Sequence, residues 1–196
     1  MNREMFTIPY DQFSEHDENK LRELSLLVEG DMLEVGCWTG HSTSILAQRA
    51  KDIKKTVIVV DNFKGNEGTP LQEFAKDNAV FNIFSNNMKE LGLFNSIELI
   101  YKDSDKAHGA IENNSVSLLF VDAGHTYKQV KNDLINYIPK VKDGGIICGH
   151  DYESDTYDEA HVNEDYVNGK HHGVIKAVNE VLGKVNYQGR MWWINK

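Results

Sequence analysis

Carboxylates and histidines recur where apolar, strand-like runs of this 196-residue sequence end. These residues are Glu34, Asp61, Asp103, Asp122, His150 and Asp151. Side chains of these types take up protons, bind ribose hydroxyls or coordinate divalent cations. In a parallel sheet the carboxyl ends of the strands meet at one edge, and ligands bind there where the strand order reverses. We therefore expect these residues to share one ligand site.

A glycine turn lies at the first of these strand ends. Residues 33–43 predict a strand, a tight turn containing Gly36 and Gly40, and the start of a helix. Such a turn leaves unpaired backbone N–H groups and forms a ligand cradle. A dinucleotide fingerprint needs glycine where Trp38 stands, and Glu34 would repel a pyrophosphate. A ligand with an ammonium group and no phosphate, such as S-adenosylmethionine, suits the turn better.

The next two strand ends suggest contacts for a nucleoside. Asp61 can accept hydrogen bonds from ribose hydroxyls, and Asn62 follows it. Asp103 and Ser104 are candidates for the adenine side, with a helix N-cap as the alternative. Because an acid at position 61 would also serve a nicotinamide cofactor, an NAD-dependent oxidoreductase remains an alternative, which the glycine turn disfavours. A cofactor-binding module without turnover is a second alternative.

The elements that position these residues alternate along the chain. After the strand that enters the glycine turn, apolar runs predict strands at 56–60, 97–101, 116–121 and 146–149. Helical patterns are found at 14–29, from 69 onward, at 127–138 and at 173–182, and residues 185–194 predict a closing hairpin. The sequence thus predicts an α/β doubly wound, Rossmann-like fold, with a mostly parallel sheet and a C-terminal antiparallel hairpin.

Length and charge restrict the class of protein. The chain has 196 residues and a net charge of −9, which fits one domain spanning residues 1–196. The negative charge disfavours nucleic acid or an anionic membrane as a partner, because both need a basic face. No apolar run is long enough to span a bilayer, and no signal core is found. We expect a soluble, cytoplasmic protein with a small-molecule partner, and formation of a homo-oligomer stays open.

The motifs together resemble the class I S-adenosylmethionine-dependent methyltransferases over nearly the whole chain. Residues 34–36 with Gly40 resemble their first motif, although Trp38 stands where a glycine is frequent. Asp61 resembles the ribose-binding acid, and residues 103–104 resemble the adenine-side loop. A narrower similarity, to the family-24 methyltransferases related to macrocin-type sugar O-methyltransferases and the cephalosporin hydroxylase group, rests on residues 120–127, 144–145, 149–152 and 173–178.

This resemblance implies a single methyltransferase domain that methylates a hydroxyl of a small molecule, such as a sugar or another natural product. The cofactor-binding residues would be Glu34, Gly36, Trp38, Gly40, Ser42, Asp61, Asn62, Asp103 and Ser104. The catalytic residues would be Asp122, His125 and His150. In related metal-dependent enzymes the ligands end the fourth and fifth strands, which here implies Mg²⁺ or another divalent cation on Asp122, His150 and Asp151.

Two alternatives remain for the acceptor chemistry. His150 stands where an acid is more usual, which shifts the preference of a cation site towards manganese, iron or zinc. In a metal-free site, His125 or His150 would be the base, with a near-neutral pKa. The acidic loop at 152–172 has no clear periodicity. We expect its histidines 161, 171 and 172 to be solvated, its tyrosines 152, 157 and 166 to form a lid, and Trp192 and Trp193 to be packing residues.

Overall fold

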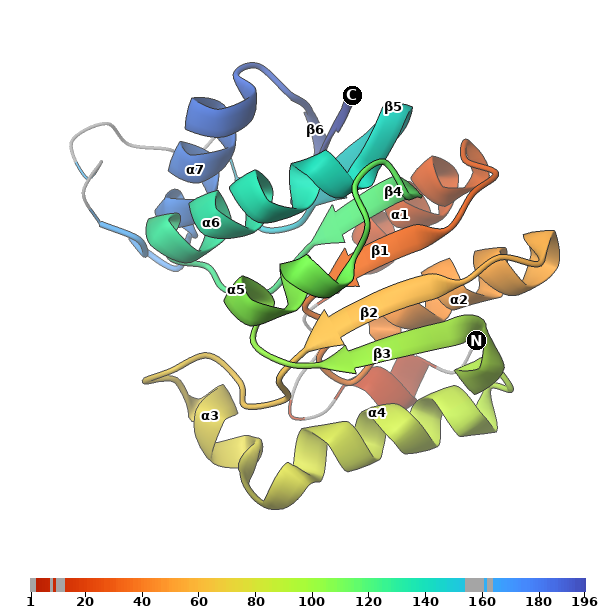
Figure 1. The fold of residues 1–196 in the computed structure, drawn as a ribbon. Helices are drawn as coiled ribbons and strands as arrows, with labels where there is room; N and C mark the ends of the chain where they lie inside the picture. Colours follow the sequence, from red (N-terminus) through yellow and green to blue (C-terminus); the bar gives the residue numbers. More distant parts are fainter. Residues whose placement is uncertain (1–2, 8, 10–12, 154–160, 162–163) are drawn as a thin grey trace.

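The computed structural model describes residues 3–7, 9, 13–153, 161 and 164–196 (Figure 1). Its strands are β1 (Met32–Val35), β2 (Val57–Asp61), β3 (Ile97–Tyr101), β4 (Val116–Val121), β5 (Val141–Gly149), β6 (Asn186–Gln188) and β7 (Met191–Asn195). They form one sheet in the order β3-β2-β1-β4-β5-β7-β6. The first five are parallel, whereas β7 runs antiparallel to both β5 and β6. The predicted fold class and closing hairpin are confirmed.

Helices cover both faces of this sheet. They are α1 (Glu15–Leu26), α2 (His41–Ile53), α3 (Pro70–Phe74), α4 (Ala79–Glu90), α5 (Ser104–Ala107), α6 (Tyr127–Tyr137) and α7 (His172–Leu182). Short 3-10 helices lie at Arg3–Phe6, Lys76–Asn78, Phe94–Ser96, His108–Ala110 and Ile138–Lys140. Figure 1 shows α1, α2 and α4 on one face and α5, α6 and α7 on the other, each packed on its own apolar core. No helix in the described ranges is long and apolar enough to cross a membrane.

Two helices beside the site begin with capping boxes. Before α6, the Thr126 side chain accepts a hydrogen bond from the backbone of Gln129, and the Gln129 side chain accepts one in return. This start is the one that the sequence predicts. Ser14 and Asp17 make the same reciprocal bonds at the start of α1. Each box satisfies backbone N–H groups that a helix start leaves unpaired, and so fixes where the helix begins.

The strand register brings the predicted residues to one edge. Val35 of β1 lies level with Val60 of β2 and with Val121 of β4. Val121 in turn lies level with Gly149 of β5. The residues that follow these strands therefore emerge side by side. The strand order reverses between β1 and β4, which is where ligands bind in open α/β sheets.

Candidate active site

The glycine turn after β1 is packed directly against the residues after β4. Gly36 has φ +88, and a Cβ at this position would lie 2.3 Å from the carbonyl oxygen of Asp122. Gly40 has φ +93 and begins α2, and a Cβ there would lie 2.8 Å from Met88 Cε. Side chains at these positions would be both strained and obstructed. Glycine therefore lets the turn and the loop carrying Asp122 approach each other.

The Asp61 carboxylate stabilises the glycine turn through hydrogen bonds to its backbone. Its Oδ2 atom accepts hydrogen bonds from the backbone N–H groups of Cys37, at 2.7 Å, and Trp38, at 3.1 Å. Its Oδ1 atom accepts one from the Phe63 N–H group, at 2.6 Å. Trp38 adopts φ 48, a left-handed conformation, and its ring centroid lies 6.0 Å from that of Phe74. A ribose bound to Asp61 would share this carboxylate with the turn.

Glu34 lies inside the protein rather than at its surface. Its side chain is fully buried, and its carboxyl group accepts hydrogen bonds from the hydroxyls of Ser42 and of Thr43, the latter at 2.5 Å. Burial raises the pKa of Glu34 to about 8, although the two hydroxyl donors oppose the rise. Glu34 and Ser42 thus tie β1 to the first turn of α2. A contact between either residue and a cofactor stays a prediction.

A cleft of about 370 Å³ opens beside the turn, at the ends of β2 and β3. It is lined by Asn62, Lys64, Tyr101, Lys102, Asp103 and Lys106. Within it, the Asn62 amide donates a 2.8 Å hydrogen bond to Asp103. Ser104 bonds away from this cleft: its carbonyl accepts a hydrogen bond from Tyr137. Burial raises the pKa of Asp133 to about 6, and the Ser104 hydroxyl opposes that rise. The volume lies within the range of small-ligand sites.

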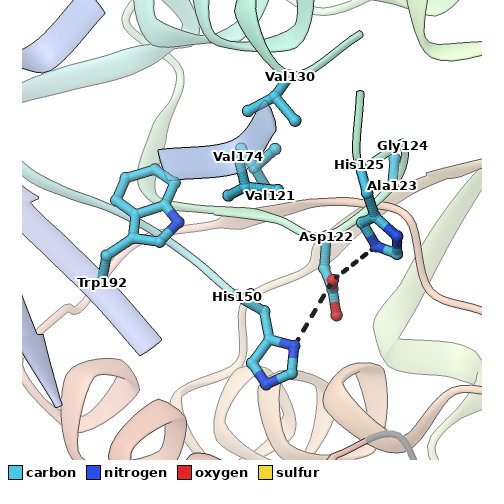
Figure 2. A pocket seen from close by; sticks show the side chains of 9 residues that line it. All are labelled: Val121, Asp122, Ala123, Gly124, His125, Val130, His150, Val174 and Trp192. Atoms are coloured by element: carbon cyan, nitrogen blue, oxygen red, sulfur yellow. Dashed lines mark ion pairs between the residues drawn. The ribbon is translucent and has the colours of Figure 1, made fainter. Parts of the chain in front are cut away.

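The predicted acceptor residues form one cluster. Figure 2 shows Asp122 between the rings of His125 and His150, with its Oδ1 atom 3.9 and 3.8 Å from their nearest nitrogens. Asp151 approaches the same two ring nitrogens, 2.9 Å from Nε2 of His125 and 3.3 Å from Nδ1 of His150. The cavity of about 10 Å³ behind these residues, which Trp192 also lines, is too small for a substrate.

The two histidines carry positive charge at neutral pH. Burial lowers the pKa of each, but hydrogen bonds and charges from Asp122 and Asp151 outweigh burial and raise both values to about 10. Burial would conversely raise the pKa of Asp151, yet His150 and His125 hold it well below its usual range. The expectation of a near-neutral histidine is therefore wrong for this arrangement, because carboxylates surround both rings.

Three further elements, for which the sequence analysis predicted no contact with the cluster, also contribute side chains to it. From α1, the Asp17 carboxylate lies 3.2 Å from Nε2 of His150, and both side chains are buried. From the β6–β7 hairpin, Arg190 forms an ion pair with Asp151 and a second with Glu153, at 3.3 Å. The available signal was the hairpin itself, because a strand antiparallel to β5 begins where β5 ends.

The third of these elements is the segment before α7. The predictions that the histidines of the acidic loop are solvated and that its tyrosines form a lid are partly wrong. His171 is half-buried, with its ring 4.6 Å from that of His125, and His172 is only 2% exposed. Tyr152 is also buried and donates a 2.7 Å hydrogen bond to Asn179. Tyr166 is 60% exposed, Tyr157 lies outside the described residues, and His161 is half-buried. Trp192 is buried, as expected of a packing residue, and Trp193 is half-buried beneath the Lys20 ammonium group.

Among the described residues, two groups bring three ligand atoms within 4.8 Å of one another, as a metal site requires. One is the predicted set of Asp122, His150 and Asp151. The other consists of His125, Asp151 and His171. Asp151 belongs to both groups and adopts φ 61, an uncommon backbone conformation for a residue other than glycine.

Comparison with known proteins agrees with this architecture. A family model described as a methyltransferase domain, family 24, matches residues 33–152. The chain belongs to this family. Among solved structures, the O-methyltransferase NovP superposes with a TM-score of 0.65 at 16% identity, covering 91% of this chain and 78% of NovP. The calicheamicin methyltransferase CalS11 gives a TM-score of 0.62 at 15% identity, covering 99% of this chain and 82% of CalS11.

Two curated relatives match part of the chain. An uncharacterized protein of Acanthamoeba polyphaga mimivirus is 29% identical over 123 residues, which are 62% of this chain and 51% of that protein. An uncharacterized protein of Sinorhizobium fredii is 29% identical over 124 residues, which are 62% of this chain and 13% of that protein. The match thus spans about half of the viral protein and a small part of the bacterial one.

Proposed function

We propose that this protein transfers a methyl group from S-adenosylmethionine to a hydroxyl oxygen of a small molecule. One observation carries the proposal: the glycine turn after β1 and the cluster of acids and histidines after β4 and β5 meet at the point of strand reversal. Gly36 lies directly against the backbone of Asp122. A donor held by the turn and an acceptor held by the cluster would therefore be neighbours, as a direct transfer requires.

The residues around the turn fit this cofactor. The cleft lined by Asn62 and Asp103 has room for a nucleoside. Asp61, which bonds to the turn and directly precedes Asn62 of the cleft, would take the ribose hydroxyls. The turn at residues 36–40 would then hold the methionine end. The similar folds of NovP, an O-methyltransferase, and CalS11, a TDP-rhamnose 3'-O-methyltransferase, support the same assignment.

The cluster supplies the acid–base chemistry. When bound, S-adenosylmethionine supplies a methyl carbon on a sulfonium, which the acceptor oxygen attacks in line as the carbon–sulfur bond breaks. Asp122 is 23% exposed at its side chain and can take up the proton of an acceptor hydroxyl. The charged ring of His125, 28% exposed, would stabilise the negative oxygen that develops. His150, which is buried between carboxylates, would hold Asp122 in place.

We further propose that the cluster binds a divalent cation. Asp122, His150 and Asp151 offer two carboxylates and one imidazole within reach of one another. This donor set fits a cation such as Mg²⁺ or Mn²⁺. The ion would lower the pKa of an acceptor hydroxyl and so assist its deprotonation.

The test is transfer of labelled methyl groups to a panel of hydroxylated sugars, polyols and phenols. We expect Asp122→Asn to lose about 100-fold or more in rate, whereas Asp143→Asn, at a fully exposed aspartate of β5, should keep the wild-type rate. Equal methyl-transfer rates for the two variants would show that Asp122 does not take up the acceptor proton. Loss of transfer in EDTA, with recovery on adding Mg²⁺ or Mn²⁺, supports the cation, and transfer that is indifferent to EDTA overturns that part.

A further inference from the structure

Asp151 also lies within reach of a second group of possible ligands, which consists of His125 and His171. His125 follows β4 and directs Nε2 to within 2.9 Å of Asp151 Oδ2. His171, at the start of α7, places Nδ1 3.5 Å from Asp151 Oδ1. The two imidazole rings lie 4.6 Å apart between centroids. Two histidines from separate segments thus converge on one buried carboxylate.

The ring nitrogens of these two histidines are arranged so that one atom from each ring can reach a common ion. Nδ1 of His171 is buried and makes no hydrogen bond with any described residue. The other ring nitrogen of His125, Nδ1, lies 3.3 Å from the side-chain amide of Asn66. This contact with Asn66 fixes the orientation of the His125 ring. Nε2 of His125 is left to face Asp151 and His171.

We propose that His125, Asp151 and His171 form a binding site for a divalent first-row transition ion, such as Co²⁺, Mn²⁺, Fe²⁺ or Zn²⁺. Two imidazoles and one carboxylate are a donor set that these ions favour over Mg²⁺ and Ca²⁺, which prefer oxygen. The site is distinct in composition from the oxygen-rich group of Asp122, His150 and Asp151, and it shares only Asp151 with that group.

The surrounding charges accommodate such an ion. Arg190 pairs with Asp151 through Oδ1, while Oδ2 faces His125 and is the oxygen available to an ion. Glu153 lies 3.3 Å from the Arg190 guanidinium and 3.7 Å from His171 Nδ1. A carboxylate therefore offsets the charge of Arg190 beside the site. This binding site does not depend on the proposed methyl transfer.

The test is titration of the chelator-treated, full-length protein with Co²⁺, followed by its visible absorption and by calorimetry. We expect one ion to bind, with millimolar Mg²⁺ unable to displace it. His171→Asn should weaken Co²⁺ binding by about tenfold or more. Asparagine is favoured at a helix N-cap, so this variant should keep α7 intact. Circular dichroism checks the fold, and proton NMR of the Co²⁺ form should show shifted signals from two imidazoles.

Two further variants distinguish this site from its neighbour. Asp122→Asn removes a ligand of the other group, and its side chain lies 3.9 Å from His125 Nε2, so it should change Co²⁺ binding less than His171→Asn does. His16→Asn alters an exposed histidine of α1 and should have no effect. The proposal is overturned if His171→Asn binds Co²⁺ as tightly as the wild type, or if Asp122→Asn loses the ion while His171→Asn keeps it.

Discussion

Replacing Glu34 by glutamine tests whether this buried acid is a structural group or a partner of the cofactor. Glu34 is fully buried, and burial raises its pKa from 4.5 to about 8. The folded protein therefore keeps a proton on Glu34 at pH values where the unfolded chain has lost it. This contribution to stability is complete below pH 4.5 and is lost as the pH rises to about 8. Glutamine resembles the protonated form and carries no such dependence.

The expected effect is large because each pH unit in this range is worth about 1.4 kcal/mol. Relative to the wild type, Glu34→Gln should gain about 4 kcal/mol of unfolding free energy between pH 4.5 and pH 8. Its amide can still accept a hydroxyl bond from Ser42 or Thr43, so the helix start should survive.

Urea unfolding of both proteins at pH 5, 6.5 and 8 measures this gain. Glu98→Gln, at an exposed glutamate of β3, is the matched control and should differ from the wild type equally at each pH. If the stability difference between Glu34→Gln and the wild type is the same at all three pH values, Glu34 titrates normally and the argument from burial fails. A tenfold loss of S-adenosylmethionine affinity in Glu34→Gln, with the fold unchanged, would instead support the ammonium contact that the sequence suggested.

Two other predictions follow from the cluster. Asp17→Asn should cost about 3 kcal/mol at pH 7, because it removes the buried carboxylate that faces Nε2 of His150. Although burial opposes it, His150 lowers the pKa of Asp17 from 3.8 to about 2. The cost of the substitution should therefore shrink as the pH falls through that range. Urea unfolding checks this, with Glu15→Gln, at an exposed acid in the same turn, as the control. Zn²⁺ should inhibit methyl transfer in the wild type by occupying His125, and should inhibit His171→Asn much less; equal inhibition of both would contradict the shared site.

The strand ends could be predicted from the sequence because they are local features. Apolar runs and their β-branched residues mark where a parallel strand stops, and the register then brings Asp61, Asp122 and His150 to one edge. The capping box at Thr126 is likewise contained in four neighbouring residues. For such groups, residue type and spacing are enough to predict their place in the fold.

The environment of these side chains could not be predicted, because it depends on elements far apart in the sequence. Asp17 and Arg190 reach the cluster only through the packing of α1 and of the closing hairpin. Against the effect of burial, the carboxylates of Asp151, Asp122 and Asp17 raise the pKa of His150 to about 10 rather than leaving it near-neutral. His171 was expected to be solvated because a polar loop gives no periodic pattern, yet the start of α7 turns it towards Asp151.

The most direct test of the central claim is calorimetric titration of the protein with S-adenosylmethionine, S-adenosylhomocysteine and NAD. NAD is the demanding competitor, because Lys64, Lys102 and Lys106 line the cleft and could attract a phosphate. We predict that both sulfur compounds bind and that NAD binds at least tenfold more weakly, since the turn at residues 36–40 lacks the glycine that a pyrophosphate needs. Binding of NAD alone would contradict it.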